Sequence, residues 1–214
     1  MGYNVSKKGE MCMIENVVFD YGDTLIRFDM DAMLAAYVPD AADRALMAPV
    51  LFDRLYWDPL DVGAISREAL LSHAKTRLPR RLWDALTLAY DNWYYHTPEV
   101  PGMAALVKRL KTRYGKRLFL LSNISVEFAA HTAELPILRP FDGLVLSGPL
   151  GVAKPDPAIF RYLLETYGLD PAACCFIDDR QKNVEAAGAL GMRGLLFDGD
   201  AAALETQLLT LFSI

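Results

Sequence analysis

Short apolar runs alternate with helical patterns along most of this chain, and this alternation limits the folds that it can adopt. The runs are rich in β-branched and aromatic residues, and each is followed by a stretch with helical spacing. Strands separated by helices are typical of βαβ units, whose strands lie parallel in one sheet. We therefore expect an α/β fold with a Rossmann-like parallel sheet flanked by helices. Strands are expected at 16–19, 117–121, 143–146, 174–177 and 194–197, and helices at 103–114, 126–134, 157–167, 182–190 and 201–211.

Residues 29–97 interrupt this alternation, because they contain helical patterns rich in Leu, Ala, Trp and Tyr but no good strand. The segment falls between the first and second strands, so we expect it to lie above the carboxyl ends of the sheet, where ligands bind in open α/β folds. The chain is thus predicted to divide into an α/β core of residues 1–28 and 98–214 and an inserted α-helical cap of residues 29–97. Breaks between the helices of the insertion are expected near Pro39, Pro49, Pro59 and Pro79.

Polar side chains follow four of the predicted strands at the points where the strands end. In a parallel sheet these ends lie along one edge, so the side chains can meet. The set contains carboxylates, a hydroxyl, an amide and a lysine. Carboxylates suit Mg²⁺, and an aspartate can act as the nucleophile of phosphoryl transfer. The residues are Asp20, Ser122, Asn123, Lys154, Asp178 and Asp179.

Four motifs in this order resemble the haloacid dehalogenase-like hydrolase superfamily, most of whose members are Mg²⁺-dependent phosphatases. They are "VVFDYGDTL", "LFLLSN", "GVAKPDPAIF" and "CFIDDRQKNVEAAGALGM". The resemblance implies that Asp20 is the nucleophile and that Lys154 neutralises the charge of the nucleophile and the phosphate. It also implies that Ser122 binds the phosphate, with Asn123 beside it.

The resemblance further implies a magnesium site formed by the acids of the first and fourth strands. Asp20 and Asp179 match the acidic ligands, Asp178 matches a neighbour that binds through water, and the Gly22 backbone carbonyl matches another ligand. Apart from the resemblance, Arg180 and Asn183 follow the acid pair and are expected either to support the metal ligands, with Asn183 ordering the metal loop, or to lie on the helix surface. The helical insertion resembles the cap of the subgroup that includes sugar-phosphate phosphatases and the phosphatase domain of soluble epoxide hydrolase.

The chain departs from the family pattern at the residue that usually serves as general acid and base. Most phosphatases of the family carry an aspartate two residues after the nucleophile, where this chain has Gly22. The next residue, Asp23, should point to the opposite side if the strand alternation continues. Asp23 is therefore a candidate acid/base, but a structural role in the turn is favoured. Loss of a general acid typically costs about 10²–10⁴ in rate.

These features predict a Mg²⁺-dependent phosphomonoester hydrolase that acts on a small phosphorylated metabolite, such as a sugar phosphate, through an aspartyl-phosphate. Two other functions stay open. A catalytically impaired relative would bind a phosphorylated ligand or a protein partner. A 2-haloacid dehalogenase would use the same nucleophile without metal, and the acid pair argues against it. The sequence identifies neither the substrate nor the oligomeric state.

The composition limits the partners and the location of the protein. The net charge of −5 disfavours binding to nucleic acid through a general basic surface. No apolar stretch approaches the ~20 residues that span a bilayer, and the N-terminus lacks a secretory signal. Three cysteines, two of them adjacent, make a poor disulfide framework. We therefore expect a cytoplasmic protein. The histidines show no ligand spacing, so a zinc site is not expected.

Overall fold

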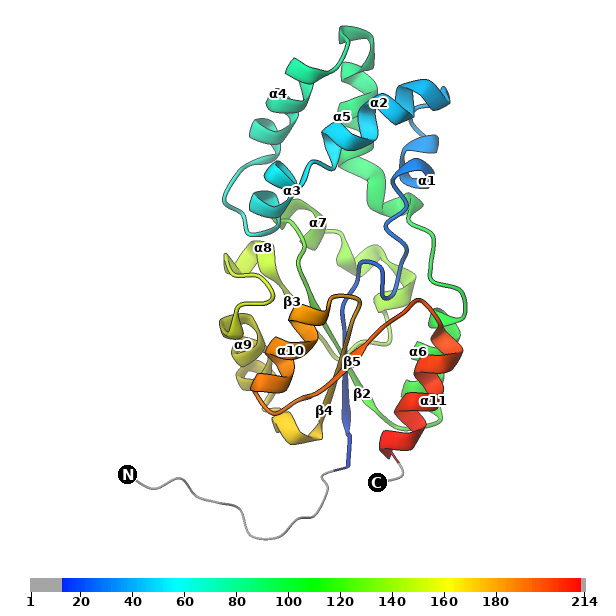
Figure 1. Cartoon of the computed structure of the whole chain (residues 1–214), viewed down its shortest axis with the longest axis vertical. Helices are drawn as coiled ribbons and strands as arrows, with labels where there is room; N and C mark the ends of the chain where they lie inside the picture. Colours follow the sequence, from blue (N-terminus) through cyan, green and yellow to red (C-terminus); the bar gives the residue numbers. More distant parts are fainter. Residues whose placement is uncertain (1–12, 213–214) are drawn as a thin grey trace, which may run out of the picture.

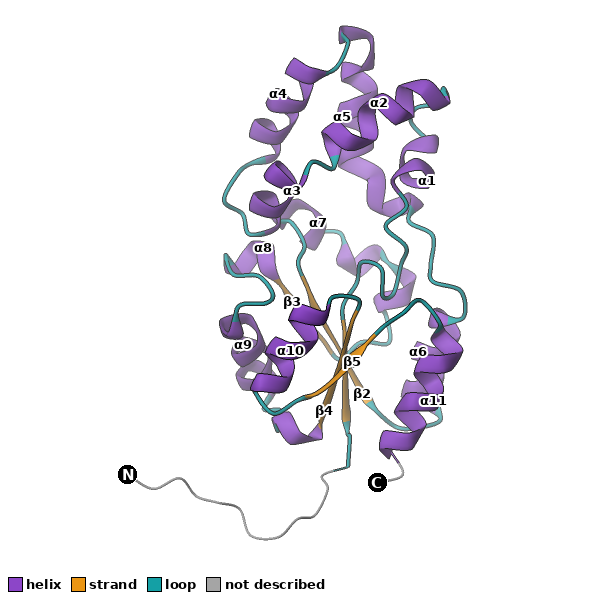
Figure 2. Ribbon diagram, in the orientation of Figure 1, coloured by secondary structure: helices purple, strands orange, loops and turns teal. Residues whose placement is uncertain are grey.

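Five parallel strands form the centre of the computed structural model, which describes residues 13–212. Their order across the sheet is β3-β2-β1-β4-β5, and Figure 2 shows them converging beneath the helical insertion. This arrangement confirms the predicted α/β fold, with strand ends within one residue of those expected. The strands are β1 (Asn16–Phe19), β2 (Arg117–Ser122), β3 (Gly143–Leu146), β4 (Cys174–Asp178) and β5 (Arg193–Leu196).

The central position of β1 places its carboxyl end between the two strands that supply the other predicted site residues. Phe19, its last residue, is in register with Leu120 of β2 and with Ile177 of β4. The next residue, Asp20, donates its backbone N–H to the Ile177 carbonyl at 2.9 Å. Asp20 therefore leaves the sheet beside the ends of both neighbours.

Helices cover both faces of the sheet, and the period-2 alternation of β1 explains why both faces are apolar. Val17 and Phe19 join the apolar cluster on the face covered by α6 (Met103–Thr112) and α11 (Ala201–Phe212), whereas Val18 joins the cluster on the other face. That face is covered by α9 (Pro157–Tyr167) and α10 (Gln181–Ala189), as Figure 1 shows.

The structure corrects the helix predicted at 126–134. It is divided into α7 (Val126–Ala129) and a 3₁₀ turn, η3 (Thr132–Glu134). The Thr132 hydroxyl donates to the Ala129 carbonyl at 3.0 Å, which competes with continued helical bonding. A short helix after β3 was also not expected. It is α8 (Ser147–Leu150), and the remaining 3₁₀ turns are η4 (Pro136–Leu138) and η5 (Pro171–Ala173).

Between β1 and β2 the chain forms a helical layer with no named strand in the described residues. It contains α1 (Met30–Ala35), α2 (Ala41–Leu51), α3 (Arg54–Asp61), α4 (Arg67–Arg77), η1 (Arg80–Leu82), α5 (Trp83–Asn92) and η2 (Trp93–His96). The first four of these helices begin after a side chain that accepts a bond from a backbone N–H of the first turn. These capping residues are Asp29, Asp40, Asp53 and Ser66.

Two of the four expected proline breaks are wrong. Pro39 and Pro79 precede helical segments, as predicted, but Pro49 lies inside α2 and Pro59 lies inside α3. Each of the internal prolines is two residues before the last residue of its helix. Each proline lacks the N–H that would bond the carbonyl four residues earlier, so each helix loses one internal hydrogen bond but is not interrupted.

The insertion is joined to the core by two adjacent segments and by an aromatic cluster. The Val100 N–H donates to the Leu25 carbonyl at 3.0 Å, which links the chain leaving the insertion to the chain entering it. Rings from both layers also pack together. The Trp93 ring centroid lies 5.7 Å from that of Phe28 and 5.0 Å from that of Phe128 in α7. Figure 1 shows the insertion stacked above the carboxyl ends of the strands.

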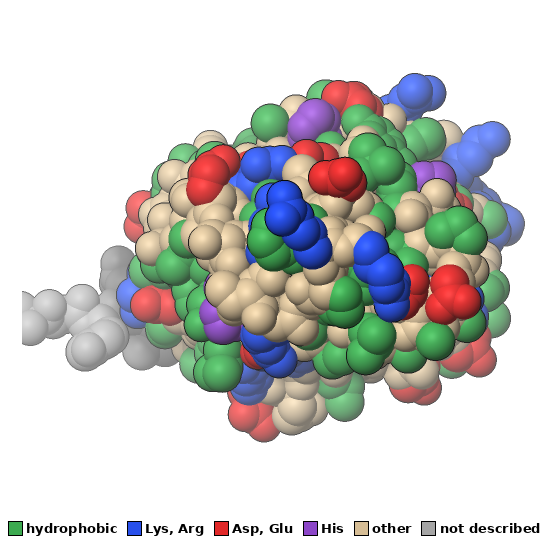
Figure 3. All heavy atoms as spheres, turned by 90° about the horizontal axis from the view of Figure 1, so that it is seen from above, with side chains coloured by type: hydrophobic (Ala, Val, Ile, Leu, Met, Phe, Trp, Pro, Cys, Tyr) green, Lys and Arg blue, Asp and Glu red, His purple; other side chains and the backbone are tan. Residues whose placement is uncertain are grey.

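The surface agrees with the charge balance of the sequence. Seen from the insertion end, acidic and basic side chains are interspersed rather than gathered by sign (Figure 3). The basic run from Lys108 lies partly on α6, where Lys111 pairs with Asp142 at 2.5 Å and Arg109 pairs with Glu205 at 2.6 Å.

No helix in residues 13–212 is long and apolar enough to cross a membrane. The prediction about the N-terminus falls on residues 1–12, outside the described part.

Candidate active site

Asp20 is the centre of a polar network at the carboxyl edge of the sheet. Its Oδ1 atom accepts hydrogen bonds from the Tyr21 N–H at 2.6 Å and from the Ser122 hydroxyl at 2.7 Å. The Lys154 Nζ atom lies 2.8 Å from the same oxygen. Within the described residues, no donor bonds the other oxygen, Oδ2. Asp20 is therefore held by one oxygen while the second is left to react or to bind a ligand.

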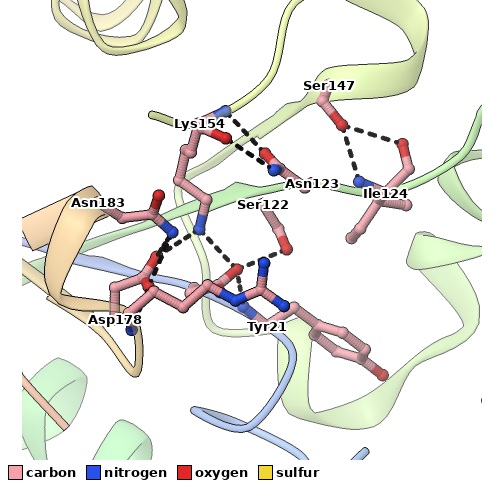
Figure 4. Close-up of polar contacts among 10 residues, drawn as sticks. Tyr21, Ser122, Asn123, Ile124, Ser147, Lys154, Asp178 and Asn183 are labelled. Atoms are coloured by element: carbon pink, nitrogen blue, oxygen red, sulfur yellow. Dashed lines mark hydrogen bonds and ion pairs between the residues drawn. The ribbon is translucent and has the colours of Figure 1, made fainter. Parts of the chain in front are cut away.

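Lys154 connects two strand ends through a buried ammonium group. Its side chain is 1% exposed, and Nζ lies 2.6 Å from Asp178 Oδ2 as well as 2.8 Å from Asp20 Oδ1. Asn123 holds the backbone of the same residue. The Asn123 amide donates to the Lys154 carbonyl at 3.0 Å and accepts from its N–H at 2.8 Å (Figure 4). The Asn123 amide is thus already engaged with the Lys154 loop.

Asp178 is fully buried and surrounded by donors. Besides Lys154, the Arg180 N–H donates to it at 2.8 Å, and the Asn183 amide donates to both of its oxygens at 2.9 and 3.0 Å. Burial and the nearby Asp20 charge raise the pKa of Asp178, and Lys154 opposes this effect. Figure 4 shows Asn183 and Lys154 converging on this carboxylate. Its position agrees with a structural or water-mediated part in a metal site.

Asp179 completes a group of three carboxylates. Ligand oxygens of Asp20, Asp178 and Asp179 lie within 4.8 Å of one another. Burial, followed by the charges of Asp20 and Asp178, raises the pKa of Asp179 to about 6. Three carboxylates and one lysine leave two negative charges when all are ionised. The donor set therefore fits a hard divalent cation, which would relieve this repulsion.

Gly22 and Asp23 both border the cavity, and their surroundings differ. A Cβ atom at Gly22 would meet nothing within 4 Å, so the usual acid position is open space beside the cavity. Asp23 is exposed and has a φ angle of 52°, and its Oδ1 accepts the Phe28 N–H at 2.8 Å. This local bond agrees with the favoured structural role, although Asp23 also borders the cavity.

The site cavity is walled by both the core and the insertion. Its core residues include the site residues predicted from the sequence except Asp178, and the insertion adds Arg54, Trp57 and Asp61. Sequence reasoning missed Asp61, which is 8% exposed. Only a weak sequence signal could have identified Asp61, because the insertion contains many acids and its hydrophobic pattern does not reveal which of them is buried. None of the three histidines belongs to a group of candidate metal ligands in residues 13–212.

The parallel sheet, its polar edge and the helical insertion after β1 are together typical of α/β hydrolytic enzymes whose site is lined by acids. The model of the haloacid dehalogenase-like hydrolase family matches residues 14–191. The chain therefore belongs to the haloacid dehalogenase-like hydrolases, as the sequence motifs predicted.

Three similarities illustrate the range of the family. The chain is 38% identical over 189 residues to drimenol cyclase drtB of Aspergillus calidoustus, covering 86% of this chain but 34% of the cyclase. It is 26% identical over 189 residues to D-ribitol-5-phosphate phosphatase of Bacteroides thetaiotaomicron, covering 84% and 89% of the two chains. A Bacteroides thetaiotaomicron enzyme of the family, solved with magnesium and inorganic phosphate, is 20% identical and has a TM-score of 0.67. The similarity covers 89% of this chain and 98% of that enzyme's chain.

Proposed function

We propose that this chain is a Mg²⁺-dependent phosphomonoester hydrolase that acts through an aspartyl-phosphate. The observation that most supports the proposal is the way in which the Asp20 carboxylate is bonded. Ser122 and Lys154 hold its Oδ1 atom, and Oδ2 has no donor in the described chain. An aspartate fixed in this way beside a lysine and two further acids suits nucleophilic attack on phosphorus.

The proposed metal ligands are the Asp20 and Asp179 carboxylates and the Gly22 backbone carbonyl, with Asp178 acting through water. The raised pKa of Asp179 supports the choice, because a cation would offset the repulsion that causes it. When bound, Mg²⁺ would neutralise negative charge on the phosphate oxygens. The phosphatase relative and the magnesium in the structural neighbour also support it.

The remaining residues orient the phosphate and balance its charge. When phosphate binds, the Ser122 hydroxyl, which has one proton, would turn from Asp20 Oδ1 to a phosphate oxygen. Lys154 would then hold the nucleophile and the incoming anion together. Asn123 contributes by fixing the backbone of Lys154. In the first step the Asp20 carboxylate attacks phosphorus and the substrate alcohol leaves. In the second, water cleaves the aspartyl-phosphate and restores Asp20.

We further propose that residues 29–97 act as a cap domain that selects a small phosphorylated metabolite, with a sugar phosphate as the leading class. Arg54, Trp57 and Asp61 come from this segment and line the cavity. The relative that acts on D-ribitol 5-phosphate supports a polyol or sugar phosphate. A cytoplasmic location and the absence of a nucleic-acid partner stay predictions from composition.

The proposal is tested by phosphate release from an aryl phosphate and from a panel of phosphorylated metabolites, with Mg²⁺ and with a chelator. We expect turnover that requires Mg²⁺ and is lost in Asp20→Asn. The matched control is Asp31→Asn, because Asp31 is an exposed acid of α1 away from the cavity. A wild-type protein that binds Mg²⁺ but releases no phosphate from any substrate would contradict the proposal.

Gly22 favours one second candidate, a relative that binds a phosphorylated ligand without turning it over. No side chain at this position can protonate a leaving group. This candidate predicts that inorganic phosphate raises the melting temperature while turnover is absent with every substrate. Turnover that disappears in Asp20→Asn excludes it.

A further inference from the structure

Asp61 is a buried acid in the site cavity that the sequence motifs do not account for. It is the last residue of α3 and is 8% exposed. It borders the same cavity as Asp20, Ser122 and Lys154. In the described part of the chain, no hydrogen bond or ion pair engages its carboxyl group. Buried carboxyl groups normally have partners, so an unpartnered one that faces a cavity points to a ligand.

The surroundings of Asp61 favour its protonated form. Burial raises the pKa of Asp61 well above its usual value. The charges of Asp58 and Asp20 act in the same direction, and those of Arg54 and Arg180 oppose it. A carboxyl group whose protonated form is favoured in this way can donate that proton, as a general acid must.

The end of α3 is fixed to the core, which gives Asp61 a defined position. The buried Ser147 hydroxyl, at the start of α8, donates to the Asp61 backbone carbonyl and accepts from the Ile124 N–H at 2.8 Å. Two residues after Asp61, Gly63 has a φ angle of 67°, and a Cβ atom there would lie 3.1 Å from the Gly148 carbonyl oxygen. The insertion thus approaches the core closely beside Asp61.

The expected reaction geometry places the leaving oxygen on the side of the insertion. In-line displacement puts the attacking and leaving oxygens on opposite sides of phosphorus. Asp20 lies at the sheet edge, so the leaving oxygen faces the overlying helices, and Figure 1 shows α3 above this edge. The position normally occupied by an acid, at Gly22, carries no side chain.

We propose that Asp61 is the general acid and base of phosphoryl transfer in this chain, a role that rests on the phosphatase function proposed above. As the Asp20 oxygen bonds to phosphorus, the bond from phosphorus to the substrate oxygen breaks, and its electron pair takes the Asp61 proton. The alcohol leaves, and Asp61 becomes a carboxylate. It then accepts a proton from the water that attacks phosphorus. The bond from phosphorus to Asp20 breaks, which releases inorganic phosphate and restores both acids.

The test compares phosphate esters whose leaving groups differ in their need for a proton. An alkyl ester such as glycerol phosphate needs protonation, whereas 4-nitrophenyl phosphate has a stable leaving anion. We expect Asp61→Asn to lower kcat for the alkyl ester by about 10²–10⁴, and to lower kcat for the aryl ester by less than about tenfold. The control is Asp84→Asn, the same change at an exposed acid of α5 that does not line the cavity, which should leave both rates unchanged.

A second variant separates proton transfer from a structural role. The open space at Gly22 accommodates a side chain, so Gly22→Asp combined with Asp61→Asn should recover a measurable part of the alkyl-ester activity. A combined variant as slow as Asp61→Asn contradicts the proposal. Equal loss on both esters, or a change in KM alone, also overturns it and assigns Asp61 to substrate binding or folding.

The outcomes distinguish this inference from the function on which it rests. If wild type releases phosphate from neither ester nor from the metabolite panel, the phosphatase function itself fails. If wild type is active and loses activity in Asp20→Asn, but Asp61→Asn behaves like Asp84→Asn, the function stands and only the role of Asp61 is wrong.

Discussion

The residues at the sheet edge show how one oxygen of Asp20 is held while the other is left accessible. Lys154 lies between Asp20 and Asp178 with its side chain 1% exposed, so a single ammonium is shared by two carboxylates. Removing one partner from such a buried group leaves an unpaired charge, which typically costs about 3–5 kcal/mol. The lysine therefore contributes to the stability of the site as well as to the proposed chemistry.

Asp179 gives a pH dependence to the proposed metal site. Its pKa is raised to about 6, so the group is neutral below that pH and a carboxylate above it. Protons therefore compete with Mg²⁺ on the acidic side. We expect the Mg²⁺ affinity, measured by titration calorimetry, to fall up to about tenfold per pH unit below about pH 6 and to level off above about pH 7.

The variant Asp179→Asn is the control for this titration. It should remove most of the Mg²⁺ affinity and should also remove the dependence on pH around 6. An affinity that is constant from about pH 5 to about pH 7 in the wild type would show that Asp179 is not a ligand.

At the scale of elements, α8 contacts the insertion through the Ser147 bond to the Asp61 carbonyl and packs against two other core segments at Gly148. A Cβ atom at Gly148 would lie 2.5 Å from the Val126 backbone nitrogen and 2.7 Å from the Ile124 carbonyl oxygen. Neither backbone atom can move without disturbing α7 or the loop after β2. Residue 148 must therefore be a glycine, because α8, α7 and the loop after β2 approach one another closely at this position.

Gly148→Ala should consequently destabilise the protein by about 1–3 kcal/mol in urea unfolding, because it overpacks backbone against backbone. The matched control is Gly188→Ala in α10, where an added Cβ atom meets nothing within 4 Å. That change should stabilise the helix by about 0.5–1 kcal/mol, because alanine has the higher helix propensity. Equal effects of the two substitutions would contradict the close packing of α8.

An element can be predicted from the sequence when the residues that cause it to form lie close together in the chain. The five strands followed from local patterns, and the ends of parallel strands share an edge, so the meeting of Asp20 with Ser122 and Lys154 could be predicted. The helix expected at 126–134 was wrong, because the Thr132 hydroxyl bond to Ala129 ends it early. Asp61 could not be found, since its place beside Asp20 depends on how α3 docks on Ser147.

In the whole molecule, the sheet edge and the helical insertion form one cavity from distant parts of the sequence. The core contributes the proposed nucleophile, the buried lysine and further acids, and the insertion contributes Arg54, Trp57 and Asp61. A continuous apolar cluster runs from the sheet into the insertion. This continuity joins α3, through its buried Trp57 and Leu60, to the sheet beneath it.

The central claim is that Asp20 becomes phosphorylated during turnover. The most direct measurement is rapid acid quenching of the wild-type protein during reaction with a phosphate monoester and Mg²⁺, followed by intact mass analysis and peptide mapping. The account predicts one phosphoryl group, located on Asp20 and absent from Asp20→Asn. Steady turnover with no phosphorylated protein, or with the phosphoryl group on another residue, would contradict it.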